Sequence, residues 1–357
     1  MIKAQLVALV AVILACAPAS VSGAVAVKRA STCNGYSDLC SRQYSNVTYI
    51  GTHDSYAVGS TSSLSSNQEL TVKDQLQSGI RALQIQGHKD SDGGSGSGIS
   101  LCHTSCKLQN GGTLEQYLSN VTDWVKSNPN DVISIFIANN DNLPASQWDK
   151  GFSSSGLRDY VYSPGTEKLS KKDWPTLQDM INKKQRVVVY MDYKANTNQV
   201  KYILPEYKNV WEDPYDQKKT PFNCTADRFD GDSDQMMYLH NHFLDKEKNI
   251  FGKSFPTPDV DQIDSTNSVN TILSNTGKCA KQHGNYPTFV LVDFFNKGNG
   301  SVFEAAARMN NVKYQGSEIS TSNTDSKQHG NGAASMRPTT LGSLSSAVLL
   351  LAVGLLF

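Results

Sequence analysis

Short apolar runs rich in β-branched residues alternate along the chain with segments whose apolar residues recur at helical spacing. Runs bounded by turn-forming residues predict strands at Val47–Ile50, Ile80–Gln86, Ile99–Cys102, Val132–Ala138, Val187–Met191, Met236–Leu239 and Phe289–Val292. Apolar residues three or four positions apart predict helices at Thr113–Ser127, Trp174–Lys183 and Ser301–Asn311. Strands that alternate with helices favour an α/β fold with a largely parallel sheet.

Polar residues recur directly after these predicted strands. The positions are His53, Gln86, His103, Asn139, Asp192, Asn241 and Asp293. In a parallel β/α barrel the carboxyl ends of the strands form the face that carries the reaction. We therefore predict one barrel domain over residues 30–311, with a polar site at that face.

Two histidines have neighbours suited to acid–base chemistry. His53 is followed by Asp54, and His103 lies between Cys102 and Cys106. Imidazole titrates near neutral pH, so a pair of histidines can supply one base and one acid to a reaction. Asp293 ends an apolar strand, where a carboxylate can orient a histidine and stabilise its imidazolium form. The alternative for both histidines is a buried, hydrogen-bonded structural role.

The two ends of the chain predict export and attachment to a surface. Residues 1–23 have the charge, the apolar core and the small residues of a secretory signal peptide, and residues 24–29 form a candidate propeptide. Residues 312–331 are rich in Ser, Thr and Asn and predict a disordered stalk. Small residues near Asn331, a polar spacer and an apolar end over 332–357 are typical of a glycosylphosphatidylinositol (GPI) attachment signal. A tail-anchored helix is the alternative. The expected location is the outer face of the cell membrane or the cell wall.

Cysteine usage agrees with export. Cys16 lies in the signal peptide, and the six cysteines that remain predict disulfides in a secreted chain. Proximity along the sequence favours Cys33–Cys40, Cys102–Cys106 and Cys224–Cys279. A zinc site at Cys102, His103 and Cys106 is the alternative, but it lacks a fourth ligand.

Potential glycosylation sites and the charge balance indicate what the surface of the protein carries. The sequons begin at Asn46, Asn120, Asn223 and Asn299. The chain has 33 basic and 33 acidic residues and no basic cluster, which argues against nucleic acid as its main partner. We expect a monomer.

Several of these segments resemble a known family. The segment Gly51–Ser55, the segment Gln75–Arg81 and the His103 strand follow one another as in the catalytic half of phosphatidylinositol-specific phospholipase C (PI-PLC). The strand Phe289–Val292 with Asp293 is similar to the last strand of the bacterial-type enzymes. Over residues 44–311 the chain resembles the secreted PLC-like phosphodiesterases of the PI-PLC X-domain superfamily. The resemblance implies a distorted TIM barrel.

The resemblance also implies a role for each residue of the site. His53 is the general base that deprotonates the inositol 2-hydroxyl, and Asp293 orients it. His103 is the general acid for the departing glycerol oxygen, and Asp54 supports it. The substrate would be a phosphodiester lipid or an inositol phosphate, and the membrane is reached through the GPI anchor.

One departure from the family concerns phosphate binding. We expect Gln84, Gln86, Arg81 and Asp192 to bind substrate, but bacterial-type members have arginine where Gln86 stands. Glutamine neither offsets a phosphate charge nor binds calcium as a carboxylate does, so no cofactor is implied. Arg81, His88 and Lys89 are nearby cations that could replace the arginine.

Two function classes therefore stay open. One is an enzyme that cleaves phosphodiesters, favoured by His53, His103, Asp54 and Asp293. The other is an inactive PLC-like barrel that binds a surface or the cell wall, favoured by Gln84 and Gln86. A metal-dependent glycerophosphodiesterase is a third alternative, but it would need more acidic ligands than Asp54.

Overall fold

The computed structural model describes residues 30–90, 96–103, 106–107, 109–250, 253–316 and 318–319, and these belong to one compact unit that ends at Thr321. The expected signal peptide, the propeptide, most of the stalk and the attachment signal at Asn331 lie outside the described residues. Within the described part of the chain, no helix is long and apolar enough to cross a membrane.

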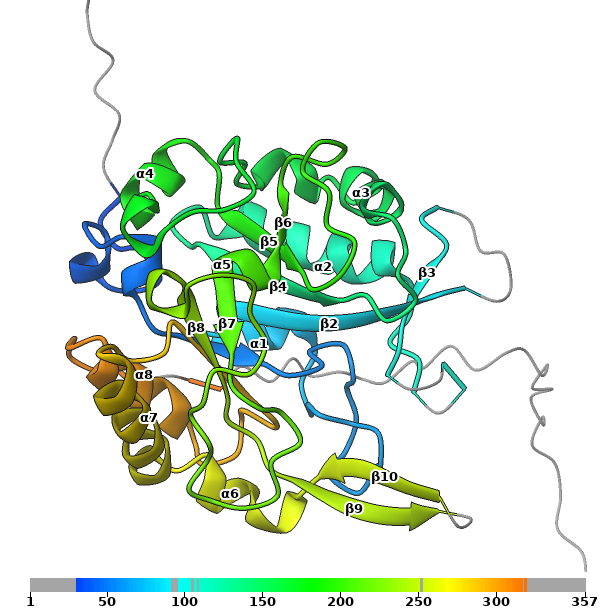
Figure 1. The fold of residues 1–357 in the computed structure, drawn as a ribbon, viewed down its shortest axis with the longest axis vertical. Coiled ribbons are helices and arrows are strands. Elements are labelled where there is room, and N and C mark those ends of the chain that lie inside the picture. Colours follow the sequence, from blue (N-terminus) through cyan, green and yellow to red (C-terminus); the bar gives the residue numbers. More distant parts are fainter. Residues whose placement is uncertain are drawn as a thin grey trace, which may run out of the picture. The chain divides into compact units, whose positions relative to one another are not determined.

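A nine-stranded sheet organises the unit (Figure 1). Its parallel strands are β1 (Tyr49–Thr52), β2 (Ala82–Lys89), β4 (Ile133–Ala138), β5 (Val187–Met191), β6 (Ile203–Pro205), β7 (Val210–Glu212), β8 (Met237–Asn241) and β11 (Phe289–Val292). They lie in the order β6-β5-β4-β2-β1-β11-β8-β7, and β3 (Ile99–Leu101) pairs antiparallel with the outer end of β2. A separate antiparallel hairpin joins β9 (Asp245–Ile250) to β10 (Lys253–Pro258).

The sheet curls into an incomplete barrel. β6 and β7 are its two edges, and the four-residue helix α5 (Glu206–Asn209) connects them. Asn209 Nδ2 donates to the carbonyl oxygen of Pro205 at 2.9 Å, so a side chain bridges the ends of this connection. The predicted parallel α/β barrel is confirmed, in an open and distorted form.

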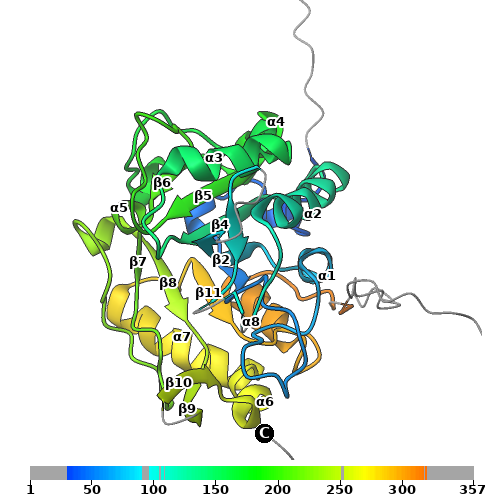
Figure 2. The same ribbon diagram turned by 90° about the vertical axis from the view of Figure 1, so that its right-hand side faces the viewer.

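Helices cover the outside of the curled sheet (Figures 1 and 2). They are α1 (Val72–Ser78), α2 (Leu114–Ser127), α3 (Ala145–Ser154), α4 (Leu177–Asn182), α6 (Ile263–Thr266), α7 (Val269–His283) and α8 (Ser301–Met309). α2 begins as predicted, because Thr113 and Gln116 form a capping box. α4 begins later than the predicted Trp174, because the Thr176 side chain caps it by accepting from the Asp179 N–H.

Four of the nine strands and helices that the structure describes and the sequence did not predict are very short, and the other five are α1, α3, α7, β9 and β10. β6 and β7 have three residues each, and α5 and α6 have four each. Runs this short show no periodicity, so their positions depend on pairing with the rest of the sheet.

Side chains alternate between the inside of the barrel and its helical coat. In β4, Ile133, Ile135 and Ile137 pack in the cluster shared with the helices, whereas Phe136 lies in the inner cluster. Phe136 lies 4.9 Å from both the Tyr190 and the Phe289 ring centroids. In a strand every second side chain points to the same face, so alternate residues of each strand point into the barrel. When this alternation is continued past the carboxyl end of the strand, it identifies the residues that reach the mouth of the barrel.

Candidate functional site

A cavity of about 520 Å³ lies at the carboxyl ends of the strands. The side chains that continue the inward-pointing rows of the strands line this cavity. They include Gln84, Gln86, Ala138, Asp192, Asn241 and Leu291. His53 continues the phase of Tyr49 in β1, and Asp293 continues that of Phe289 in β11. The paired strands β1 and β11 therefore carry a histidine and a carboxylate to adjacent places.

His53 and Asp293 form a direct contact at this edge. His53 Nδ1 lies 3.0 Å from Asp293 Oδ1, and Asn67 Nδ2 lies 3.1 Å from the same oxygen. Because a carboxylate oxygen only accepts, His53 donates from Nδ1 when its ring is neutral. Its Nε2 then carries the lone pair, which is the form that a general base requires.

Asp54 lies between the two histidines. Its Oδ2 is 3.9 Å from His53 Nε2 and 3.8 Å from His103 Nε2. The Asp54 side chain is fully buried, and within the described residues neither of its carboxylate oxygens has a hydrogen-bond partner. Its negative charge lies closest to the two imidazoles, and it favours the protonated form of His53.

The protonation of His53 follows from these neighbours. Burial alone would lower the pKa of His53, but the carboxylates of Asp293 and Asp54 raise that pKa to about 10. The ring also stacks on Phe243, with centroids 4.0 Å apart and planes 6° from parallel, which fixes its orientation. His53 is therefore an imidazolium at neutral pH.

His103 enters the pocket from the turn after β3. Its side chain is 43% exposed, against 17% for His53, so it faces solvent across the cavity mouth. Disulfides join Cys33 to Cys40, Cys102 to Cys106 and Cys224 to Cys279, as expected from their proximity. The Cys102–Cys106 bond ties the segment that carries His103 into a small ring and uses both thiols of the alternative zinc site.

The two glutamines line the pocket and are both engaged. Gln84 Oε1 accepts from the backbone N–H of Asp54 at 2.7 Å, which leaves Nε2 as the remaining donor of that amide. Gln86 Nε2 contacts the carbonyl oxygen of His103 at 3.4 Å. The same nitrogen lies 3.3 Å from His88 Nε2, so Gln86 is engaged on both sides, and both glutamines touch the histidine motifs.

Arg81 does not reach the pocket, contrary to the sequence-based expectation. Its Nη2 pairs with Asp131 Oδ1 at 2.8 Å, and its Nη1 donates to the carbonyl oxygens of Leu76 and Ile80. The guanidinium also lies 4.8 Å from the Trp124 ring centroid. Arg81 precedes β2, at the end of the strand away from the cavity, so its role is structural.

A charged wall faces the histidines from the edge strands of the barrel. Asp192, Glu206, Glu212 and Arg228 line it, and Arg228 pairs with Glu212. Burial raises the pKa of Asp192 to about 6 and, together with Glu212, raises the pKa of Glu206 well above its usual range. Of this wall the sequence predicted only Asp192, because Glu206 follows one three-residue strand, Glu212 ends another, and Arg228 comes from a loop.

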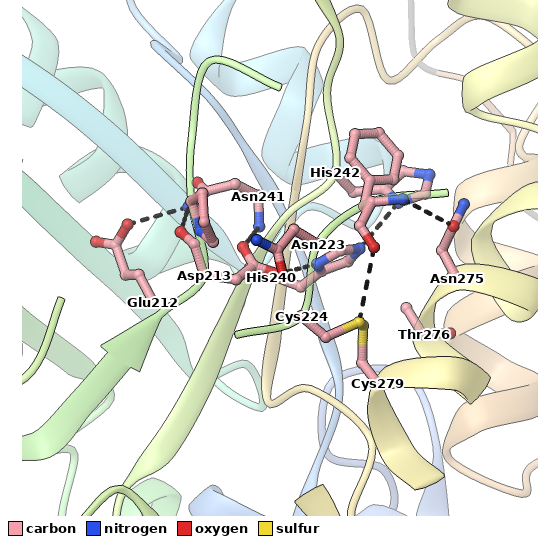
Figure 3. A network of polar contacts seen from close by, with 12 residues as sticks. Glu212, Asp213, Asn223, Cys224, His240, Asn241, His242, Asn275, Thr276 and Cys279 are labelled. Atoms are coloured by element: carbon pink, nitrogen blue, oxygen red, sulfur yellow. Dashed lines mark hydrogen bonds and ion pairs between the residues drawn. A yellow bond between two sulfur atoms is a disulfide. The ribbon is translucent and has the colours of Figure 1, made fainter. Parts of the chain in front are cut away.

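A buried network supports this wall from behind (Figure 3). Asp213 binds His240, and His240 Nε2 lies 3.2 Å from His242 Nδ1. Asn241 Nδ2 donates to Glu212 Oε2 at 3.1 Å and so connects the network to the pocket. Both histidines are fully buried, and burial together with His240 lowers the pKa of His242 to about 3, so His242 stays neutral.

This network does not form a metal site. Asp213, His240 and Cys279 are close enough to share an ion, but Cys279 is bonded to Cys224 and has no thiolate to offer. No other such cluster occurs within the residues that the structure describes.

The structure also shows where Asn139 and the asparagines of the sequons lie. Asn139 does not face the cavity, because it is out of phase with the inward side chains of β4, and its amide instead binds Leu143 and Trp148. The asparagines of the sequons, Asn46, Asn120, Asn223 and Asn299, are all exposed.

Comparison with known proteins places these residues in context. The family model described as PI-PLC X 1 matches residues 39–310. Over 293 residues the chain is 41% identical to an "Uncharacterized secreted protein" of Arthroderma benhamiae, and the match covers 80% of this chain and 65% of the relative. It is also 37% identical over 286 residues to "PI-PLC X domain-containing protein 1" of the same fungus, covering 78% of this chain and 90% of that relative.

Solved structures share the fold. PI-PLC from Listeria monocytogenes superposes with a TM-score of 0.51 at 15% identity, covering 77% of this chain and 96% of that one. A variant of PI-PLC from Staphylococcus aureus gives a TM-score of 0.53 at 13% identity, covering 77% and 94%. At such low identity the likeness extends to the fold alone.

Proposed function

Because the chain belongs to the PI-PLC X-domain family, we propose that it cleaves the phosphodiester bond of an inositol lipid or of a related head group. The reaction is an attack of an inositol hydroxyl on the neighbouring phosphorus. The oxygen–phosphorus bond to the glycerol breaks, and a cyclic phosphodiester forms.

The observation that carries this proposal is the position of Asp54 between two imidazole rings. Both Nε2 atoms lie within 4 Å of Asp54 Oδ2, so one substrate phosphate can lie between a base and an acid. His53 takes the proton of the attacking hydroxyl through Nε2, while Asp293 holds its Nδ1–H. His103 gives a proton to the leaving glycerol oxygen. Each such transfer contributes ~10²–10⁴-fold to the rate.

The remaining lining residues bind the substrate without a metal. Gln84 and Gln86 donate neutral hydrogen bonds to phosphate oxygens, and Asp192 accepts from a hydroxyl of the head group. Asp192 suits a hydroxyl because two backbone N–H groups, of Asn139 and Tyr193, already fix its Oδ1.

The second candidate function is a non-catalytic surface-binding barrel. It is favoured by Gln86, which stands where bacterial-type enzymes have arginine, and by the imidazolium form of His53. The arrangement of His53, His103, Asp54 and Asp293 favours the enzyme, because a binding protein needs no such arrangement.

The test is to incubate the purified protein with phosphatidylinositol vesicles, with and without chelator, and to follow cyclic inositol phosphate by phosphorus NMR. Cyclic product that His53→Ala and His103→Ala each abolish supports the enzyme. Vesicle binding without product, unchanged in both variants, supports the non-catalytic barrel.

We also propose that the protein is exported and held at the cell surface. The secreted relative and the six disulfide-bonded cysteines support export. The sequence pattern around Asn331 supports a GPI anchor.

A further inference from the structure

Three alternate residues of β2 face the cavity: Gln84, Gln86 and His88. Residues two apart in a strand share one face, so His88 continues the row that the glutamines begin. β2 extends beyond the barrel, where His88 pairs with Ser100 of β3. His88 therefore stands at the outer end of the pocket, one inward position beyond the glutamine that occupies the place of the family's arginine.

A carboxylate holds His88. Its Nδ1 lies 3.0 Å from Asp141 Oδ1, and Asp141 Oδ2 accepts from the Lys89 N–H at 2.8 Å. Burial would raise the pKa of Asp141, but these hydrogen bonds from Lys89 and His88 lower it, so Asp141 stays ionised. His88 Nδ1 is thus the donor to Asp141, and Nε2 is the ring nitrogen that faces the Gln86 amide.

The other ring nitrogen points back along the row toward His103. His88 Nε2 lies 3.3 Å from Gln86 Nε2, and the same amide nitrogen contacts the His103 carbonyl oxygen. One side chain, Gln86, therefore separates His88 from the candidate general acid. A phosphate that reaches Gln86 Nε2 is also within reach of the His88 ring.

We propose that His88, held by Asp141, is a further catalytic residue that in its protonated form donates from Nε2 to a non-bridging oxygen of the scissile phosphate. This inference rests on the proposed function. His88 takes its proton from solvent when the anion binds, and no covalent bond of His88 changes. An ionised donor to phosphate supplies the charge that Gln86 lacks.

The other cations close to the site are already paired. Within the described lining of the cavity, Arg228 is the only lysine or arginine. It pairs with Glu212 and lies 4.3 Å from the Tyr215 ring centroid, so its charge is already offset. Arg81 is bound to Asp131 outside the cavity.

Several charged groups surround His88. In the described part of the chain they are Asp141 from the loop after β4, His103 across Gln86, and its neighbours in sequence Lys89 and Asp90. Of these, Asp141 contacts the His88 ring directly.

The test compares His88→Gln with Lys89→Gln, which removes a positive charge from an exposed side chain on the opposite face of β2. With phosphatidylinositol vesicles we expect His88→Gln to lower kcat by about 100-fold with little change in KM, because the contact strengthens as charge develops. Lys89→Gln should match the wild type. His88→Arg should keep activity, because it retains a positive charge at the same position, and Asp141→Asn should lower kcat, because it removes the carboxylate that holds the ring.

A second substitution distinguishes a role of the His88 charge in binding phosphate from a purely structural role of His88. Gln86→Arg in the His88→Gln background places a guanidinium beside the same phosphate position and should restore much of the lost kcat. Unchanged kcat in His88→Gln overturns the inference. A loss that neither arginine variant recovers, with normal folding by circular dichroism, also overturns it.

Failure of the proposed function gives a different result. If the wild type cleaves no phosphodiester, calorimetric titration with inositol 1-phosphate near pH 6 decides this inference. Binding that His88→Gln weakens about tenfold or more, and Lys89→Gln leaves unchanged, supports the phosphate contact. Equal binding by the wild type and His88→Gln, or none by either, overturns it.

Discussion

Asn67 and Asp293 share a hydrogen bond at the oxygen that also accepts from His53. Asn67 Nδ2 lies 3.1 Å from Asp293 Oδ1. The backbone carbonyl oxygen of Asn67 accepts from the Phe294 N–H at 2.7 Å. The other oxygen of Asp293, Oδ2, is buried and has no hydrogen-bond partner within the described residues. The loop before α1 therefore holds the carboxylate in the plane in which it meets the imidazole.

Removing this amide should loosen the His53–Asp293 pair. We expect Asn67→Ala to lower the free energy of unfolding by about 2 kcal/mol, because a hydrogen bond to a charged group is lost. We also expect kcat to fall about tenfold, because the base is less well oriented. Urea unfolding and initial rates measure the two effects. Ser62→Ala, at an exposed position of the same loop, is the control, and an unchanged kcat in Asn67→Ala would show that Asp293 needs no such support.

The acid side of the pH–rate profile should report His53. Burial lowers the pKa of His53, and the charges of Asp293 and Asp54 raise it to about 10. A base acts only after losing its proton, so kcat/KM should rise about tenfold per pH unit below that value. Asp293→Asn removes the largest raising charge and should move the rise to lower pH. The exposed residue Asp264 offers a control, Asp264→Asn. An unshifted profile in Asp293→Asn would mean that another group limits the rate.

Arg81 should matter for stability and not for chemistry. Arg81→Gln removes a partly buried ion pair with Asp131 and should lower the free energy of unfolding by about 2 kcal/mol, with kcat retained. Lys73→Gln breaks a solvent-exposed pair with Asp123 and should change stability by less than about 1 kcal/mol. Denaturant titration of both variants beside the wild type checks this. A selective loss of kcat in Arg81→Gln would contradict the assigned structural role.

We expect two of the disulfides to differ in their effects, one mainly on the free energy of unfolding and the other mainly on kcat. Cys224 and Cys279 are 55 residues apart, so replacing both with Ser should lower the free energy of unfolding by about 4 kcal/mol through the wider unfolded ensemble. Cys102 and Cys106 are 4 apart, and the same double change should lower it by only about 2 kcal/mol. Because the second bond closes the His103 segment, its removal should reduce kcat more than that of the first. Thermal denaturation and initial rates decide, and the reverse order of kcat losses would refute this assignment.

Surface attachment can be tested by truncation. Ending the chain after Gly330 should release folded protein into the medium, because all described residues precede this point. The full-length protein should remain cell-bound until a lipase that cuts GPI anchors is added. Recovery of a mature protein that retains residues 347–357 would rule out the anchor.

The apolar pattern by itself determined seven of the nine strands of the large sheet, but not β6 and β7, and it determined the polar residues that follow several of them. The run Phe289–Val292 is a strand with the predicted bounds, and Asp293 follows it at the pocket. The pattern could not show which side chains face inward. Because the strands of a parallel barrel are buried on both faces, the alternation that would reveal the phase is hidden. Asn139 therefore looked like a site residue, although it faces away from the cavity.

Only the tertiary structure decided which charged side chains face the pocket and which are paired with another group elsewhere. Arg81 has the chemistry of a phosphate ligand, but it is paired with Asp131, which lies 50 residues away in the loop before β4. His88 looked equivalent to Lys89 in the sequence, and the contact with Asp141, 53 residues away, distinguishes it. Asn67, Glu206 and Arg228 come from loops or from the ends of very short elements, which carry no periodic signal. Local patterns determine where a strand runs, whereas the compensation of a charge depends on which distant group the folded chain brings within a few ångströms of it.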